Sequence, residues 1–347
     1  MDGNSVCGCP ACKEAKAHYG DADSGAFLKF ICDVDRIVQK YLQDQADLEG
    51  KPKRKVHICC NAYYKMEKPP TKHIEDIGIT DTTAIDIAPI TANYQTSFYD
   101  QTCPESKSAA DNIVKWYKTV GLKNIYYWLY DTNFAYYLYP YNTFAYTPEN
   151  LRFTAENGAL YMFYEGQHQQ GAATVFSRFK EYLEYIFEVN VNEDYNTVKN
   201  HFFESYFREA SEPMLKMFDE LQSHMEYLCH TYSSLSSGNI YSEIAKTEYW
   251  PKGLLDRWLG YIDDAYAKID DYKYSDATLF KVLTNNIKLE SIFPRYAEIV
   301  HHGGKFADAE LIEMKTSFIN DCAALNVTHY ADKNLAQITN LKQDWGV

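Results

Sequence analysis

The sequence lacks any long hydrophobic run and carries fewer basic than acidic residues. No segment approaches the roughly 20 apolar residues that a membrane-spanning helix requires, so we expect no membrane span. Lys and Arg total 34 against 48 Asp and Glu, a net charge of −14, and no stripe of Lys or Arg is present. Because a phosphate backbone is bound through a basic face, this composition argues against a nucleic acid as partner.

Motifs of several common enzyme classes are also absent. The sequence contains no Ser-centred nucleophile elbow, no phosphate-binding loop and no glycine-rich dinucleotide fingerprint. The adjacent His301 and His302 have no carboxylate or cysteine at metal-ligand spacing, so we interpret them as a polar turn between helices. We therefore expect no cofactor and no catalytic metal.

Aromatic residues are the unusual part of the composition, with 31 Tyr and 18 Phe among 347 residues. A Tyr side chain combines apolar area with a polar tip, which suits half-wet grooves such as sugar-binding clefts. Codon bias in an AT-rich genome would give the same enrichment, and the composition alone leaves both interpretations open. Apolar residues make up 46% of the chain, enough to bury a substantial core.

Strand and helix patterns alternate in the first half of the chain. Runs of strand-forming residues occur at 56–64, 84–90, 125–130 and 160–164, and helical spacing occurs at 22–49, 104–120, 147–158 and 173–188. We expect Ser24 to cap the first helix and Gly50 to end it. The connection at 71–83 shows no clear pattern. This alternation predicts parallel strands joined by crossover helices, in either a doubly wound sheet or a barrel.

From about residue 193 the strand pattern stops. Aromatic and aliphatic side chains recur there at helical spacing, which predicts five further helices. The chain is thus expected to comprise an α/β domain at 1–190 and an all-α extension at 191–347.

The residues that follow the predicted strands share one character. In parallel α/β folds, ligands bind at the carboxyl ends of the strands. These ends carry two carboxylates and a set of aromatic, amide and imidazole side chains: Asp131, Glu165, Tyr63, Asn93, Trp128, Tyr130, Asn133, Phe134, Gln167 and His168. Aromatic faces stack on sugar rings, amides bond hydroxyls, and a carboxylate pair supplies acid and base for glycosidic cleavage. The pattern predicts a carbohydrate cleft, with packing of Trp128 and Tyr130 inside the fold as the alternative.

Nine cysteines are present, and only Cys7, Cys9 and Cys12 are clustered. The odd count leaves at least one thiol unpaired within the chain. The cluster suits a structural zinc ion with a fourth ligand from elsewhere, or disulfides to distant cysteines, and Cys103 is the obvious loop partner for either role. Unliganded thiols are the remaining alternative.

Six segments of the first 230 residues, taken in order and spacing, carry a resemblance. They are residues 2–13, 24–30, 61–63, 103–105, 126–134 and 156–165. The most specific elements are the C-x-C-x-x-C motif and the W-x-Y-x-T-N-F motif that begins at Trp128. They resemble a family described as a domain of unknown function in bacterial carbohydrate-active proteins, whose barrels are distantly similar to those of α-glucuronidases and β-N-acetylhexosaminidases.

The resemblance implies a partial (β/α)8 TIM-type barrel of about four βα units, followed by the helical extension. In the family the cysteine motif follows the fourth barrel strand, whose end carries an Asp, and here that residue is Asp2. Residues 1–190 would then be the C-terminal half of a barrel. Because a half-barrel leaves two sheet edges open, it would need an N-terminal half-barrel partner or an upstream segment. The resemblance also suggests an extracellular or cell-surface location.

The sequence departs from the family at Leu129. Where the family has W-D-Y, this chain has W-L-Y at 128–130, with Asp131 as the next residue, whereas Glu165 keeps its place. The leading hypothesis is a glycoside hydrolase-like protein that acts on or binds an oligo- or polysaccharide, with Glu165 paired to Asp131 or Asp2. The alternatives are a non-catalytic carbohydrate-binding or scaffold protein, and a truncated fragment of a larger glycosidase-like protein.

Overall fold

The computed structural model describes residues 6–167, 171–332 and 336–347. The chain forms two compact units, each built from two segments. Unit 1 comprises Met1–Tyr130 with Glu149–Glu165, and unit 2 comprises Asp131–Pro148 with Gly166–Val347. Two of the predicted site residues, Asp2 and His168, lie outside the described residues.

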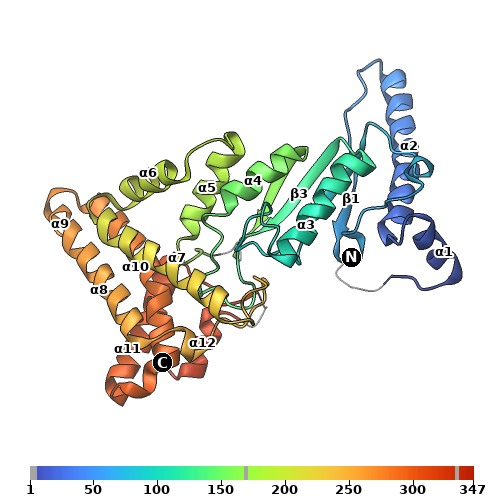
Figure 1. Ribbon diagram of the computed structural model, residues 1–347. Helices are drawn as coiled ribbons and strands as arrows, with labels where there is room; N and C mark the ends of the chain where they lie inside the picture. The colour runs from blue at the N-terminus through green and yellow to red at the C-terminus, as the bar shows by residue number, and fades with distance from the viewer. Residues whose placement is uncertain (1–5, 168–170, 333–335) are drawn as a thin grey trace. The chain divides into compact units, whose positions relative to one another are not determined.

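Unit 1 contains a sheet with helices packed on it (Figure 1). Its strands are β1 (Ile58–Tyr63), β2 (Thr83–Ala88), β3 (Asn124–Tyr130) and β4 (Ala159–Glu165). Its helices are α1 (Pro10–His18), α2 (Asp23–Glu49), α3 (Pro104–Lys115) and most of α4 (Thr147–Glu156). Shorter turns are a π-helical turn at Trp116–Val120 and 3-10 turns at Tyr64–Met66 and Ile74–Asp76.

The four strands lie in the order β1-β2-β3-β4, and every pair is parallel. This confirms the predicted mixed α/β class, and each observed strand begins and ends within about two residues of the predicted one. Among the described residues, β1 pairs only with β2 and β4 only with β3. The strands therefore form a sheet that is open at both edges and does not close into a barrel.

The connection between β1 and β2 contains no α-helix, although all its residues are described. It is held instead by Asp35 of α2, whose carboxylate accepts hydrogen bonds from the hydroxyls of Thr80 and Thr82. Burial tends to raise the pKa of Asp35, but these hydrogen bonds outweigh it and leave the pKa below its usual value. A buried ionised carboxylate thus fixes a segment in which the sequence shows no periodicity.

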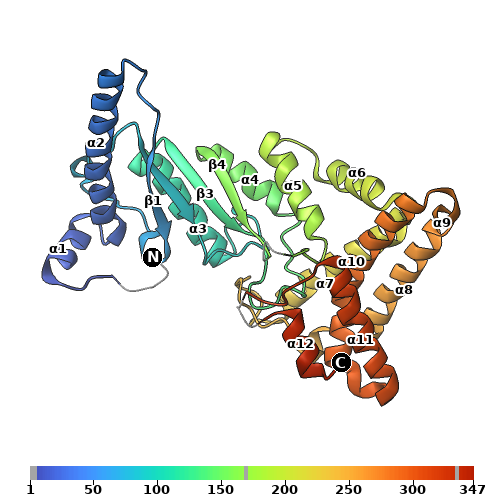
Figure 2. The ribbon, with the colours of Figure 1, turned by 180° about the vertical axis from the view of Figure 1, so that it is seen from behind.

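The two faces of the sheet differ in character. Register partners in parallel strands share a face, and one face carries Cys60, Ala62, Ile85, Ile87, Ile125, Tyr127 and Leu129. All seven are buried, on the side of α2 and α3. The sheet lies in front of α3 in Figure 2. By register its other face carries the exposed or half-buried Cys59, Asn61, Tyr63, Asp86, Tyr126, Trp128, Tyr161, Phe163 and Glu165, together with the buried Ala84, Ala88, Asn124 and Tyr130. We call this second side the exposed face.

Unit 2 is helical apart from one isolated antiparallel bridge, between His329 and Gln337, as far as its residues are described. Its helices are α5 (Ser177–Val189), α6 (Tyr195–Phe207), α7 (Ser211–Thr231), α8 (Lys252–Ile269), α9 (Tyr272–Ser275), α10 (Ala277–His302), α11 (Asp308–Leu325) and α12 (Ile338–Trp345), with 3-10 turns at Arg208–Ala210, Thr247–Tyr249 and Gly303–Lys305. Helix α5 belongs to this unit, although the predicted boundary near residue 190 groups it with the strands. No helix among the described residues is long and apolar enough to cross a membrane.

Two apolar clusters form the interior of unit 2. The first is aromatic and consists of Phe144, Phe176, Phe179, Phe203, Phe207 and Phe218, each no more than 1% exposed. The second is largely aliphatic and includes Leu138, Leu289, Ile292, Ile299, Phe318, Ile319, Val327, Ile338 and Leu341. The aromatic stripes of the helical region are therefore core, as their spacing indicates.

Local predictions at two helix ends need correction. Helix α2 begins at Asp23, and the Ser24 hydroxyl donates to the carbonyl of Lys68 at 2.5 Å rather than capping the helix. Gly50 ends this helix in the left-handed conformation, with φ of 63°, as predicted. His302 lies in the last turn of α10, buried, with Nε2 2.8 Å from the carbonyl oxygen of Trp250, and not in a turn between helices.

Candidate functional site

Trp128 and Glu165 lie side by side at the carboxyl end of the exposed face. The pairing of β3 with β4 places Trp128 opposite Phe163. Glu165 lies two residues beyond Phe163 on β4 and therefore on the same face. The indole Nε1 of Trp128 donates to Oε2 of Glu165 at 2.8 Å, and the Phe163 ring meets the indole edge-on at 4.8 Å between centroids. A carboxylate is thus held beside two aromatic rings by a charge-assisted hydrogen bond.

The exposed face continues across β1 and β2 with polar groups. Asn61 lies opposite Asp86, and partial burial raises the pKa of Asp86. The Tyr126 hydroxyl lies 2.5 Å from Nδ1 of His57, and Tyr63 is half-buried at the end of β1. The face therefore offers aromatic surfaces, hydroxyl and amide groups and carboxylates, which is the chemistry that the strand ends predict.

Two other predicted site residues of unit 1, Asn93 and Tyr130, are buried. The Asn93 Oδ1 accepts the backbone N–H of Gln95 at 2.9 Å, and its Nδ2 lies 3.6 Å from Sγ of Cys103. The Tyr130 ring packs against Tyr94 at 5.8 Å between centroids. The structure therefore places both side chains in local packing, although Tyr130 is the register partner of Glu165 and shares its face.

In unit 2, Asp131 belongs to a buried cluster that sequence analysis missed. The Nζ atom of Lys180, from α5, donates to the backbone carbonyls of Asp131 and of Tyr141, the latter at 2.8 Å. The same ammonium lies 5.1 Å from the centroid of the Phe144 ring. Glu184, one turn further along α5, interacts electrostatically with both Asp131 and Lys180. Three titratable groups thus meet largely out of contact with solvent.

Burial governs the protonation of this cluster. It raises the pKa of Asp131 and that of Glu184 above their usual values, and it lowers the pKa of Lys180. The Asp131 carboxyl also raises the pKa of Glu184, because each of two neighbouring carboxyls disfavours ionisation of the other. Among the described residues, Asp131 Oδ1 and Glu184 Oε1 have no hydrogen-bond partner.

The sequence does contain a signal for this cluster. The buried side of α5 is formed by Phe179, Leu183 and Phe187, and Lys180 is buried with them. A lysine at a position where helical spacing requires an apolar side chain needs a polar partner inside the fold. Glu184, four residues later on the same helix, is the natural candidate for that partner.

Three further predicted residues, Asn133, Phe134 and Gln167, join loops of unit 2. The Asn133 Nδ2 donates to the carbonyl of Ser242 at 2.8 Å, and the backbone N–H of Phe134 donates to another carbonyl of the same loop, also at 2.8 Å. The Gln167 Nε2 donates to the carbonyl of Tyr137 at 2.9 Å. Their side chains or backbones are thus engaged in holding irregular segments in place.

Glu67 is a second buried carboxyl that sequence analysis missed, this time in unit 1. It is 7% exposed, and its two oxygens accept hydrogen bonds of 3.4 Å from Thr91 and Asn112. Burial raises the pKa of Glu67 to about 7, against the lowering effect of these bonds. The Trp116 indole also donates to the Glu67 carbonyl at 2.9 Å, so the residue links α3 to the loop after β1.

The structure groups Cys7, Cys9 and Cys12 at the start of α1, with their three Sγ atoms within 4.8 Å of one another. All three are exposed free thiols. The backbone N–H of Cys12 and the neighbouring thiols lower the pKa of Cys9, whereas hydrogen bonds from the other two thiols raise that of Cys12 to about 11. Cys103 is not a member of this group and contacts Glu105 at 3.6 Å.

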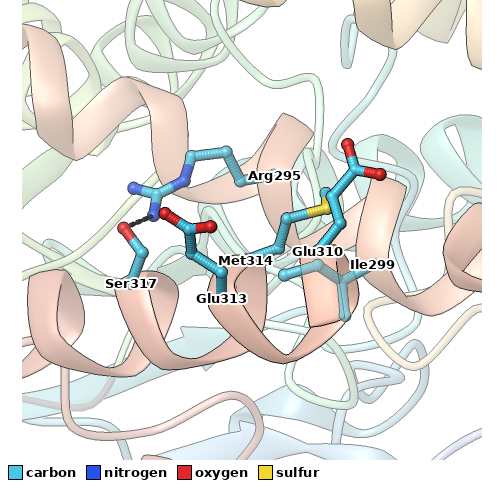
Figure 3. A pocket seen from close by; sticks show the side chains of 6 residues that line it. All are labelled: Arg295, Ile299, Glu310, Glu313, Met314 and Ser317. Carbon is cyan, nitrogen blue, oxygen red and sulfur yellow. Dashed lines mark hydrogen bonds between the residues drawn. The ribbon is translucent and has the colours of Figure 1, made fainter. Parts of the chain in front are cut away.

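A cavity of unit 2 lies between α10 and α11, away from the predicted residues (Figure 3). It has a volume of about 300 Å³, and its lining includes Met314, Ile299 and two glutamates. The guanidinium of Arg295 is held at its edge by Asp321 at 2.7 Å and by Ser317 at 3.1 Å. A second hollow, of about 440 Å³, is lined by the last turns of α2 and the loop that follows. Neither is lined by residues of the exposed face.

A comparison with known families finds a match that covers much of the chain. The family model described as Domain of unknown function (DUF4838) matches residues 1–220, well over half of the chain. The matched segment covers unit 1 and the region of unit 2 that contains Asp131, Lys180 and Glu184. No significant match was found among curated proteins or among solved structures.

Proposed function

We propose that this chain, which belongs to the family described as Domain of unknown function (DUF4838), is a glycoside hydrolase-like protein that binds a carbohydrate at the carboxyl ends of its parallel strands. The proposal rests on the site, because the description of the family states no function. The binding surface is the exposed face of unit 1. The substrate class is an oligo- or polysaccharide, since the face combines flat aromatic rings with hydrogen-bonding groups.

The pairing of Trp128 with Glu165 is the observation that carries this proposal. The C–H face of a pyranose ring stacks on an indole, and a carboxylate accepts hydrogen bonds from sugar hydroxyls. Since Trp128 already donates its N–H to Glu165, the carboxylate and the indole are fixed relative to each other at 2.8 Å. Such pre-ordering lowers the entropic cost of binding a flexible glycan.

A binding measurement tests the proposal directly. We expect wild-type protein to bind a subset of an oligosaccharide array, and the Trp128→Ala variant to bind those glycans about tenfold more weakly or worse, a loss of ~1.4 kcal/mol. The matched control is Tyr274→Ala, which removes an aromatic residue of unit 2 that is 85% exposed. An equal loss in both variants, or no binding by the wild type, would contradict the proposal.

For hydrolysis, we assign the role of catalytic carboxylate to Glu165. Two carboxyls about 5–9.5 Å apart are required. The other carboxylate of the exposed face, Asp86, lies level with Tyr126, whereas Glu165 lies level with Tyr130. Four residues of strand amount to about 13 Å, so Asp86 is too far away to act with Glu165. The glycoside hydrolase hypothesis therefore requires Asp131 or Asp2 as the second carboxyl.

Turnover of the bound glycan separates catalysis from binding. In a glycosidase, Glu165→Gln removes the ionised carboxylate while it preserves shape, so product release from the glycan should fall by at least about 100-fold with binding retained. Reducing-end release by wild type and variant at equal protein concentration measures this. Equal rates in the two proteins would exclude Glu165 as the catalytic group.

Burial of Asp131 favours a second candidate function, a non-catalytic carbohydrate-binding protein. Asp131 is 7% exposed and lies close to Lys180 and Glu184, and it belongs to a different unit from Glu165. A carboxyl with these contacts reaches a substrate only if the cluster opens. Glycan binding that depends on Trp128, together with no turnover of any bound glycan, would support this candidate over the first.

We also propose that the sheet of unit 1 is part of a TIM-type barrel, which a second half-barrel completes. Both edges of the sheet are unpaired among the described residues, and the exposed face has the mixed side chains of a barrel interior. Co-expression with a polypeptide of about four βα units, encoded next to this chain, should give an equimolar complex in which β1 and β4 become protected from amide hydrogen exchange. A complex without that protection would mean that the sheet is not completed in this way.

A further inference from the structure

We propose that Cys7, Cys9 and Cys12 form a binding site for a thiophilic divalent cation of the zinc class. In a tetrahedral zinc site with Zn–S bonds of about 2.3 Å, the sulfur atoms lie about 3.8 Å apart. The three Sγ atoms are already within 4.8 Å of one another, so the thiols need to close by less than about 1 Å around an ion. The fourth position is left to solvent or to a donor outside the described residues.

The other cysteines of the chain show why this cluster is unusual. A free cysteine with no chemical role is normally buried as a small apolar side chain. Cys32 and Cys322 follow this rule, since both are 0% exposed. Cys7, Cys9 and Cys12 are exposed and yet converge. Convergence of three thiols on a surface, without burial, is the arrangement that a metal ion stabilises and that packing does not.

The position of the cluster indicates what the ion does. Helix α1 contains no buried residue, so no core holds its first turn. Its other end is anchored, because Lys16 pairs with Asp23 at 3.0 Å and Tyr19, just beyond the helix, is buried. An ion bound at Cys7, Cys9 and Cys12 would fix the segment that leads into α1, as structural zinc does in small folds.

A second group of ligand atoms on the same helix provides an internal competitor. His18, at the end of α1, lies with His73 and Asp76, and their ligand atoms are also within 4.8 Å. In that group His18 Nε2 already pairs with Asp76 at 2.8 Å, and the two imidazole rings are stacked. Nitrogen and oxygen ligands are harder than thiolates, so a thiophilic ion distinguishes the two groups.

Metal binding by the reduced full-length chain tests this site. Zn²⁺ is titrated and the bound ions are counted by native mass spectrometry, and Co²⁺ is used in parallel because thiolate ligands give it a charge-transfer absorption band. We expect the wild type to bind Zn²⁺ and to show this band. The variant Cys7→Ser, Cys9→Ser, Cys12→Ser should lose one bound ion and the band.

Two matched variants complete the design. A triple serine variant of Cys59, Cys103 and Cys229, which are not in the cluster, should retain the ion and the band. The pair His18→Ala and His73→Ala should also retain them. Loss of the ion in the histidine variant but not in the Cys7, Cys9 and Cys12 variant would overturn the proposal, as would a disulfide within the cluster of protein purified with zinc.

Hydrogen exchange gives a readout that does not depend on any substitution. Zn²⁺ should slow amide exchange in the first turn of α1 and leave α2 unchanged, since α2 is already held by the core through Leu28 and Cys32. Unchanged exchange in α1 at saturating Zn²⁺ would overturn the structural role that we assign to the ion.

Discussion

Aromatic side chains on the exposed face of unit 1 differ in their environment from those in the core of unit 2. On the sheet of unit 1, Tyr161 is 59% exposed, and Trp128 and Phe163 are half-buried on the same face. In unit 2, Phe179 and Phe218 are 0% exposed and pack ring against ring at 5.3 Å. The aromatic residues of the exposed face and those of the core of unit 2 are therefore two different features, and only the exposed set needs a ligand to explain it.

Carboxyls on the exposed face of unit 1 differ in the same way from the buried carboxyls of unit 2. Glu165 lies half-buried on the exposed face and accepts the indole N–H of Trp128. In unit 2, Glu290 is 2% exposed and accepts the backbone N–H of Phe176 at 2.6 Å, and Asp131 and Glu184 share the buried cluster with Lys180. Surface carboxyls are available to a substrate, whereas these buried ones make the stability of unit 2 depend on pH.

The largest expected effect is at the aromatic core of unit 2. Phe218 packs against Phe144 at 4.9 Å and Phe203 at 5.1 Å, so Phe218→Ala leaves a cavity and should lower the free energy of unfolding by about 3–5 kcal/mol. Denaturant titration followed by hydrogen exchange locates the loss in unit 2. Trp128→Ala, on the exposed face, should cost less than about 1 kcal/mol. Similar costs at the two positions would remove the distinction between core and surface.

The next effect, of about 3 kcal/mol, is expected for Lys180→Met. Loss of the ammonium leaves the carbonyls of Asp131 and Tyr141 without their donor and the adjacent carboxyls without a counter-charge. Lys216→Met is the control, because this exposed lysine pairs only with Glu212 along the same helix and should change stability by less than about 0.5 kcal/mol. If Lys180→Met left the free energy of unfolding unchanged, the cluster would be hydrated and not desolvated.

The pH dependence of stability is expected to differ between the wild type and Glu290→Gln. Burial raises the pKa of Glu290 from 4.5 to about 8, so the folded state retains a proton that the unfolded state releases. Stability from this group is complete below about pH 4.5 and is lost as pH rises to about 8, by at most about 1.4 kcal/mol per pH unit.

Denaturant titrations of unit 2 between pH 5 and pH 8 measure that slope. The glutamine side chain of the variant still accepts the N–H of Phe176 but does not ionise, so the variant should lose stability less steeply with rising pH. Asp131 and Glu184 contribute in the same direction and leave a residual slope. In unit 1, Glu67→Gln should act likewise over a narrower range, because the pKa of Glu67 is raised only to about 7. Parallel slopes for wild type and variant would show that Glu290 ionises freely.

The fold was predictable in segments where the apolar residues recur with a single period, either helical or alternating. The strand at 125–130 and the helix at 22–49 were found because each buries a regular set of apolar residues. Helix α1 was missed because none of its residues is buried, so no apolar period marks it. The β1–β2 connection was missed because Asp35 fixes it through hydroxyl groups from distant threonines, which leave no local pattern.

The site was predictable only in part. The strand-end rule named both Trp128 and Glu165, and the pairing of β3 with β4 places them on one face. Position after a strand does not decide how exposed a side chain is, however. Asn93 and Tyr130 follow the same rule and are buried. Lys180 and Glu184 come from a helix after the last strand, so no rule based on strand ends would include them.

The smallest expected effect is that of Tyr161→Ser on the exposed face. Tyr161 is 59% exposed, and its one ring contact on the face is with Tyr126 at 6.1 Å between centroids. The free energy of unfolding of the isolated chain should therefore change by no more than about 0.5 kcal/mol. If the face is instead covered in the assembled protein, the same substitution should weaken the complex while the chain alone stays unaffected. A loss well above about 1 kcal/mol in the chain alone would mean that Tyr161 is part of a core, and unit 1 would then resemble unit 2 in its use of aromatic residues.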